Sequence, residues 1–104
     1  MLIEADECIF DRDLLKSSSG FDSLDPVGKE AFVNHMHVDG ENRIAESDCI
    51  IQDWISEMNA KWPGRVFRIY RDVRPEEVII RFHLVRQRVP DWCDSDLEII
   101  QVIT

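Results

Sequence analysis

Two histidines and an aspartate at alternating positions, His35, His37 and Asp39, have the residue types and spacing that metal chemistry requires. Neutral imidazole nitrogens and carboxylate oxygens are ordinary zinc ligands. Residues two apart on a strand point to the same side of a sheet, so both histidines can approach His83 on a neighbouring strand. A three-histidine metal site is therefore one hypothesis. The alternative, which the rest of the sequence favours, is a half-exposed strand face with polar side chains and no bound metal.

The spacing His-x-His-x-Asp resembles the first half of the zinc motif of the metallo-β-lactamases. That motif continues with a histidine directly after the aspartate, where this sequence has Gly40. The further metal ligands downstream are also missing, and chains of that family are much longer. The fold and activity of the family are therefore not carried over, and we predict neither a metal nor another cofactor.

Residues 65–88 form a basic segment inside an acidic chain, with seven arginines against three acids and hence a net charge of +4. The segment contains two runs of residues typical of β-strands. Because side chains alternate between the two faces of a sheet, certain arginine, tyrosine and histidine side chains of these runs lie on one face. These residue types together bind carboxylates or phosphates and stack on planar rings. If 31–38 is a strand of the same sheet, two more histidines join this face. The predicted ligand- or partner-binding residues are Arg68, Tyr70, Arg81, His83, His35 and His37. A solvated sheet face, neutralised by acids of nearby loops, is the alternative.

The sequence shows no set of residues typical of catalysis. Phosphate-binding loops, dinucleotide fingerprints and nucleophile elbows are absent from it. Cys93 stands close to Asp91 and Asp94, whose charges oppose formation of the nucleophilic thiolate. We therefore predict no catalytic residue and favour a protein that is not an enzyme. The cysteines are odd in number and widely spaced, which is typical of free thiols in a reducing compartment; they are Cys8, Cys49 and Cys93.

Length and composition indicate one folded domain covering residues 1–104. The chain is 44% hydrophobic and 32% charged, which is ordinary for a globular protein. Its 21 acids and 12 bases give a net charge of −9, which argues against nucleic-acid binding and favours a basic partner. The first ten residues lack the basic region of a secretory signal. No apolar stretch approaches the roughly 20 residues of a membrane span. We expect a cytoplasmic protein without membrane contact.

Residues 41–62 are predicted to form a long amphipathic helix. One face carries Ile44, Ile51, Ile55, Met58 and Trp62, with Trp54 at its edge, and the opposite side carries Glu46, Asp53 and Glu57. Two strands around a turn at 72–76 should follow, and a further strand should cover 97–104. The predicted core residues of the two strands around the turn are Phe67, Ile69, Val78, Ile80, Phe82 and Leu84.

The first third of the chain is harder to interpret. Residues 2–15 fit an amphipathic helix, although a strand at 2–10 is the alternative. A mobile loop is expected at 16–23, where three serines precede a glycine. Asp25 and Pro26 mark the start of a brief helix. Alternation favours a strand over 31–38, with a helix as the alternative.

The element order strand–helix–strand–strand–strand indicates an α+β fold, a two-layer sandwich of one long helix on a mostly antiparallel sheet of three or four strands, with an extra N-terminal helix as an option. When helices cover only one face of a sheet, the other face is covered by another segment, exposed to water or buried in a dimer. The first functional hypothesis is thus a non-enzymatic binding module that uses this open face for a partner, an anionic ligand or itself as a homodimer. The second is an inhibitor or immunity-type protein that covers a basic toxin with its acidic helix face. The third is a small enzyme for an anionic substrate.

Overall fold

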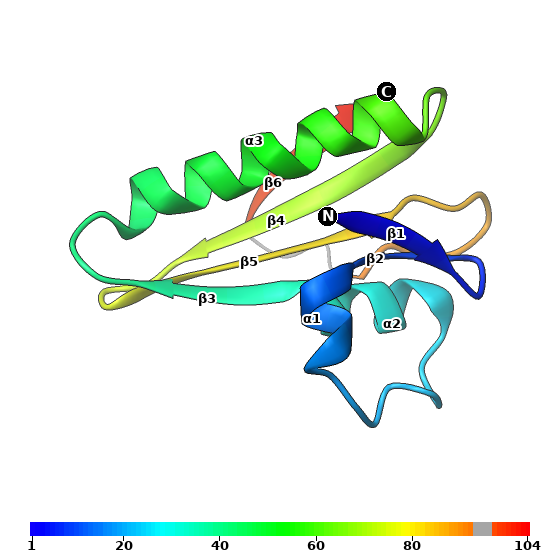
Figure 1. Ribbon diagram of the computed structural model, residues 1–104, viewed down its shortest axis with the longest axis horizontal. Helices are drawn as coiled ribbons and strands as arrows, with labels where there is room; N and C mark the ends of the chain where they lie inside the picture. Colours follow the sequence, from blue (N-terminus) through cyan, green and yellow to red (C-terminus); the bar gives the residue numbers. More distant parts are fainter. Residues whose placement is uncertain (93–96) are drawn as a thin grey trace.

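A four-stranded antiparallel sheet with one long helix across it forms the centre of the protein (Figure 1). In this computed structural model, which describes residues 1–92 and 97–104, the strand order is β3-β5-β4-β6. The strands are β3 (His35–Asp39), β4 (Val66–Val73), β5 (Glu77–Leu84) and β6 (Glu98–Ile103), and the helix is α3 (Arg43–Lys61). The predicted two-layer α+β class and the order strand–helix–strand–strand–strand are confirmed.

The β4–β5 hairpin follows the predicted alternation residue by residue. Phe67, Ile69, Val78, Ile80 and Phe82 are fully buried, and Leu84 is 2% exposed. All six belong to the core under α3. Because side chains alternate along a strand, this assignment also fixes the residues of the opposite sheet face, which we call the outer face.

Helix α3 buries one side, and its phase was predicted correctly except at its start. The residues buried along it are Ser47, Ile51, Trp54 and Met58, and Ile55 and Trp62 pack against the same core. Ile44 was predicted on this face but is 48% exposed, because it lies in the first turn at the margin of the layer. The helix ends at Lys61, directly before Trp62, Pro63 and a left-handed Gly64 (φ 83°).

The prediction of one helix over 2–15 was wrong. The chain instead forms a second sheet of two strands, β1 (Leu2–Ala5) and β2 (Cys8–Asp11), followed by the short helix α1 (Arg12–Lys16). Asp6 and Glu7 make the two-residue turn with φ of 52° and 66°, the left-handed geometry of a tight hairpin. The side chain of Asp11 then accepts hydrogen bonds from the Asp13 and Leu14 N–H groups and begins α1.

The segment 26–38 divides into a helix and a strand. Helix α2 (Pro26–Val33) is capped by Asp25, whose carboxylate accepts a hydrogen bond from the Gly28 N–H at 2.7 Å, as the aspartate and proline predicted. The strand expected from residue 31 begins only at His35, so residues 31–33 were assigned wrongly. The helix was missed because the apolar Phe32 is exposed and interrupts the helical spacing of the buried residues. The buried residues of α2 are Val27, Glu30, Ala31 and Val33.

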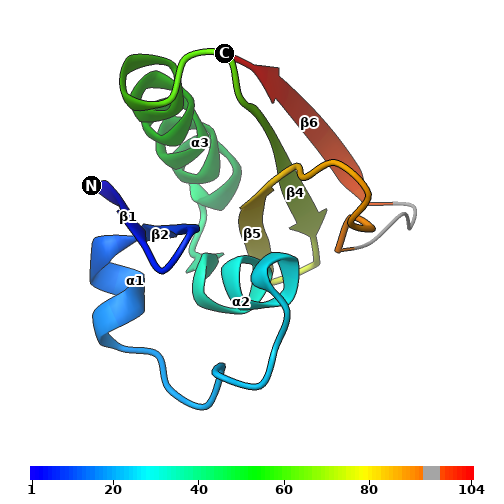
Figure 2. The same ribbon diagram turned by 90° about the vertical axis from the view of Figure 1, so that its right-hand side faces the viewer.

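The outer face of the sheet is partly covered by α2 and by the chain that follows β5 (Figure 2). Arg81 on this face donates a hydrogen bond to the Ala31 carbonyl of α2 at 3.3 Å. Trp92 of the following chain meets the ring of Tyr70 edge-on, with 5.2 Å between ring centroids. The expectation of an open face is therefore corrected, because these two segments shield part of it. Within the described residues, no helix is long and apolar enough to cross a membrane.

Candidate functional site

The six predicted binding residues lie on the outer face, on three neighbouring strands. In the register of the sheet Arg68 pairs with His83, Tyr70 with Arg81, and Arg81 with His35. Their exposure differs, since Tyr70 is 1% exposed and His83 is 0% exposed. The structure thus groups the residues as predicted but removes two of them from solvent. Their role in binding stays a prediction.

Tyr70 and His83 form a buried hydrogen-bonded pair. The Tyr70 hydroxyl lies 2.8 Å from His83 Nε2, and His83 Nδ1 lies 3.0 Å from the Leu84 carbonyl oxygen. A carbonyl only accepts, so Nδ1 carries the proton and Nε2 accepts the hydrogen bond of the hydroxyl. Burial lowers the pKa of His83, against the opposing hydrogen bond to Leu84 and the charge of Asp91 3.9 Å away. The imidazole is therefore held neutral, as a packed polar contact.

The two arginines of the outer face are engaged by residues 91 and 92. An Arg68 guanidinium nitrogen lies 3.2 Å from the Asp91 carboxylate, with both side chains 26% exposed. The Arg81 guanidinium lies over the Trp92 ring, 4.3 Å from its centroid, in cation–π geometry. Both contacts hold the chain after β5 against the sheet. Cys93, the next residue, lies outside the described residues.

His35 and His37 stand on the exposed part of β3, where their rings are 5.4 Å apart. His37 Nδ1 lies 2.6 Å from a Glu77 carboxylate oxygen, and His35 Nδ1 contacts the Phe32 carbonyl. Both ring nitrogens of His83 have hydrogen-bond partners, so the three histidines do not converge on one point. Among residues 1–92 and 97–104, no group of three or more His, Cys, Asp or Glu side chains is arranged to hold a metal ion.

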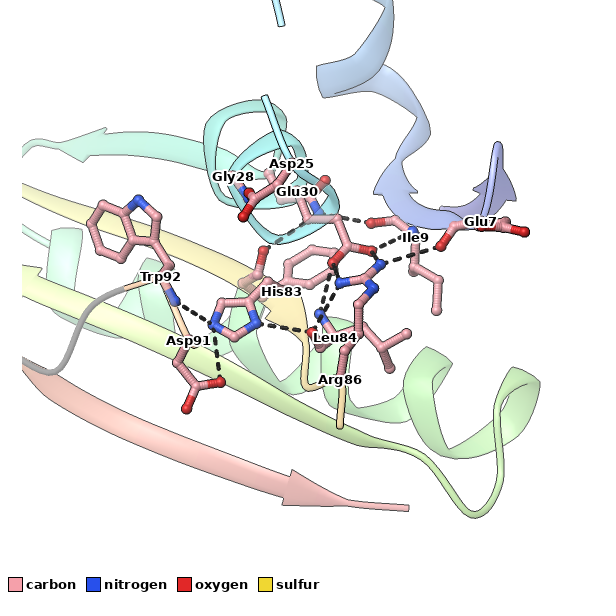
Figure 3. Close-up of polar contacts among 12 residues, drawn as sticks. Glu7, Ile9, Asp25, Gly28, Glu30, His83, Leu84, Arg86, Asp91 and Trp92 are labelled. Atoms are coloured by element: carbon pink, nitrogen blue, oxygen red, sulfur yellow. Dashed lines mark hydrogen bonds and ion pairs between the residues drawn. The ribbon is translucent and has the colours of Figure 1, made fainter. Parts of the chain in front are cut away.

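Two polar side chains, Glu30 of α2 and Asn34 directly after this helix, connect the N-terminal hairpin to the main sheet, and both are 0% exposed. The Glu30 carboxylate accepts hydrogen bonds from the Ile9 N–H at 2.6 Å and from the Leu84 N–H at 3.0 Å (Figure 3). The Asn34 amide donates to the Ile9 carbonyl and accepts from the Asp11 N–H. These side chains satisfy strand backbone groups that β3, which begins at His35, does not reach. We call Glu30 and Asn34 the polar bridge.

Arg86 completes the surroundings of Glu30. Its two terminal nitrogens lie 2.6 and 2.9 Å from the two Glu30 oxygens, and it also donates to the Glu7 carbonyl at 3.2 Å. Burial alone would lower the pKa of Arg86, but the hydrogen bond and charge of Glu30 outweigh burial and raise it. Sequence reasoning missed this ion pair. The available signal was the spacing Val27, Glu30, Asn34, a helical face with polar residues in apolar surroundings.

An open groove lies between α3 and the N-terminal hairpin, with a volume of about 440 Å³. Its apolar surface comes from Met1, Met36, Ile50 and the buried Trp54, and its polar surface from Ser56 and three carboxylates. The Trp54 indole N–H donates to one Asp11 oxygen at 3.3 Å. The carboxylates are those of Asp11, Asp53 and Glu57.

The three carboxylates of this groove differ in what surrounds them. Glu57 accepts hydrogen bonds from the Leu2 N–H and from Lys61. Burial would raise the pKa of Glu57, but these contacts outweigh burial and lower it, so the carboxylate is charged at neutral pH. Asp53 is exposed, as the helical phase predicted. The groove therefore joins negative charge to an apolar floor, which suits the charged head and aliphatic stem of a basic side chain.

Comparisons with known proteins add no assignment. No family model, no curated protein and no solved structure matches the chain.

Proposed function

We propose that this chain is a small acidic binding protein, not an enzyme, that receives a basic side chain of a protein partner in the groove between α3 and the N-terminal hairpin. The observation that carries the proposal is the placement of Asp11, Asp53 and Glu57 around an apolar floor in a cavity of about 440 Å³. A net charge of −9 supports it, since a strongly acidic surface steers basic partners into contact. This is the inhibitor- or immunity-type hypothesis, with a defined surface.

Several arginines of the basic segment are paired with carboxylates of the same chain, which also favours a basic partner. Arg68 faces Asp91, and Arg86 is paired with the buried Glu30. Arg71 bridges Asp48 of α3 and Glu98 of β6, and its pKa is raised, chiefly by the hydrogen bond to Glu98. The basic segment therefore serves largely to hold the acidic chain together. Carboxylates remain in excess at the surface.

Two variants with the same change of charge test the groove. Asp53→Lys reverses a charge inside it, and Glu76→Lys makes the same reversal at the exposed β4–β5 turn. The unmodified chain and both variants serve as bait for basic proteins, and the captured partner is then titrated by calorimetry at two salt concentrations. Asp53→Lys should weaken binding by a factor of ten or more, which is about 1.4 kcal/mol, and Glu76→Lys should have a small, salt-screened effect. Equal losses would show that only net charge matters, and binding unaffected by Asp53→Lys would exclude the groove.

A second candidate is an anion site on the outer face, the first hypothesis from sequence. The observation that favours it is the pairing of His35 with Arg81 in the sheet register, with His37 beside them at the exposed edge strand. A thermal shift with inorganic phosphate or citrate tests it. The shift should vanish in Arg81→Glu and persist in Arg88→Glu, an exposed arginine elsewhere. Equal shifts in both variants would exclude this face.

A further inference from the structure

The free edge of β6 differs from the edges that stable proteins usually present to solvent. Among the described strands, β6 pairs only with β4 and ends the sheet on the side opposite β3. Edge strands are normally short, charged, bulged or covered, because their unpaired N–H and C=O groups attract other strands. β6 reads Glu-Ile-Ile-Gln-Val-Ile, and Ile99 and Ile103 are 37% and 73% exposed. Helix α3 packs on β1, β3, β4 and β5, and the β6 edge extends away from it (Figure 2).

The register with β4 determines which backbone groups point to the free edge. The Thr104 N–H donates to the Arg65 carbonyl at 3.0 Å, so Thr104 and every second residue before it belong to the hydrogen-bonded pairs with β4. The residues between them direct their N–H and C=O groups away from the sheet. These residues are Ile99, Gln101 and Ile103, whose side chains all lie on the outer face.

From this pattern we propose that β6 pairs antiparallel with β6 of a second copy of this chain, about a two-fold axis at Gln101. Ile99 of each copy then faces the partner's Ile103, and Gln101 faces the partner's Gln101. Every outward N–H and C=O of the three residues finds a partner in this register, and the exposed isoleucines of both copies come together in cross-strand pairs. If the register shifts by one residue, the N–H and C=O groups that point to the free edge face partner residues whose groups point to β4. If it shifts by two residues, some of the N–H and C=O groups at the free edge have no partner.

The other sheet face is complementary in charge in the same register. Glu98 faces the partner's Thr104, and Thr104 lies beside the exposed Arg65 of its own chain. Glu98 already contacts Arg71 at 2.8 Å. The row of side chains across the dimer therefore reads Arg71, Glu98, then Thr104 and Arg65 of the partner, so that the Glu98 side chain lies between basic side chains of the two copies. This self-complementarity is why a second copy, not an unrelated strand, is the occupant.

Sedimentation velocity over a concentration series tests the dimer with a matched pair of variants at the axis. Gln101→Pro removes the outward N–H and no hydrogen bond to β4, a change that edge strands accept. Gln101→Ala keeps the N–H. We expect the wild type and Gln101→Ala to dimerise reversibly, and the dissociation constant of Gln101→Pro to rise by a factor of about ten or more because two central hydrogen bonds are lost. A wild type that stays monomeric up to about 1 mM, the range of weak association, or a dimer that a folded Gln101→Pro leaves unchanged, would overturn the proposal.

Cysteine cross-linking tests the register itself and does not depend on the proline variant folding. Opposed residues of a hydrogen-bonded antiparallel pair have Cα atoms about 5.5 Å apart, within disulfide range. In a chain carrying Cys49→Ser and Cys93→Ser, mild oxidation of Gln101→Cys should give a covalent dimer. Ile99→Cys should not, because the two copies of residue 99 are four residues apart along the strands. Equal cross-linking of both variants, or none of either, would overturn the register.

Discussion

Replacing the buried Glu30 by glutamine tests whether the polar bridge holds the N-terminal hairpin to the sheet. The Glu30 carboxylate, fully buried, accepts hydrogen bonds from the Ile9 and Leu84 N–H groups and from two nitrogens of Arg86. Glutamine has nearly the same shape, but its amide nitrogen is a donor and would face donors. It also leaves the Arg86 charge without its counterion.

The expected cost follows from these contacts. Removing one partner of a buried ion pair costs about 3–5 kcal/mol. A domain of this size has a stability of about 5–15 kcal/mol, so Glu30→Gln removes a large share of it. For 104 residues, 1 kcal/mol corresponds to roughly 5 °C in Tm, so we expect Tm to fall by roughly 15–25 °C.

Urea unfolding, followed by circular dichroism, measures this cost, with Glu76→Gln at the exposed turn as control. The double variant Glu30→Gln/Arg86→Gln should be more stable than the sum of the single losses predicts, because neither charge is then left alone. A loss below about 1 kcal/mol for Glu30→Gln, the value of one ordinary hydrogen bond, would refute the reasoning. Additive single losses would show that the two residues act independently.

Three further predictions concern the core and the titrating groups. Ile51→Asp should unfold the protein, because an unpaired carboxylate would be buried under α3, whereas Asp53→Ala should change Tm little; thermal melts giving the reverse order would show that the helix phase is wrong. The lowered pKa of His83 makes stability fall as pH drops below about 6.5, where the unfolded chain takes up a proton first, with a slope of up to about 1.4 kcal/mol per pH unit. In urea titrations between pH 7 and 5, His83→Gln should lack this component, and an unchanged slope would contradict the assignment. Burial raises the pKa of Cys8, so iodoacetamide should label the exposed Cys49 in the native protein and Cys8 only after unfolding; comparable native rates would be inconsistent with this structure.

The parts of the fold that could be predicted from sequence are those with unbroken periodicity. In β5, Val78, Ile80 and Phe82 alternate with Ile79 and Arg81, and one assignment to the core fixed both faces. Helix α3 was predictable for the same reason, with a spacing of three and four residues over several turns. At its first turn the period continues to Ile44, but periodicity carries no information about where the covered layer ends.

The N-terminal third was not predictable, because its determinants lie elsewhere in the chain. The sequence signal of a tight hairpin is normally Asn-Gly or Asp-Gly, whereas Asp6 and Glu7 adopt left-handed backbone angles without a glycine. Glu30 is an ordinary helix residue until its partner Arg86 is placed beside it, 56 positions away. The outer face was predicted correctly in its membership. Its shielding by Trp92 depends on the path of a loop, which local pattern does not determine.

The contact between Arg86 and the Glu7 carbonyl joins residues 79 positions apart and has a consequence for synthesis on the ribosome. Chains are made from the N-terminus, and domains fold as units when their contacts become available. The polar bridge needs Leu84 and Arg86, so residues 2–11 have no complete set of partners until most of the chain has emerged. Loop closure over such a span also slows folding. Leu2 and Ile9 of this hairpin belong to the main core and lack their partners on β4 and β5 until late in elongation. In a nascent chain stalled before residue 84, we expect proteases to cut at this hairpin, and limited proteolysis of stalled chains would check this.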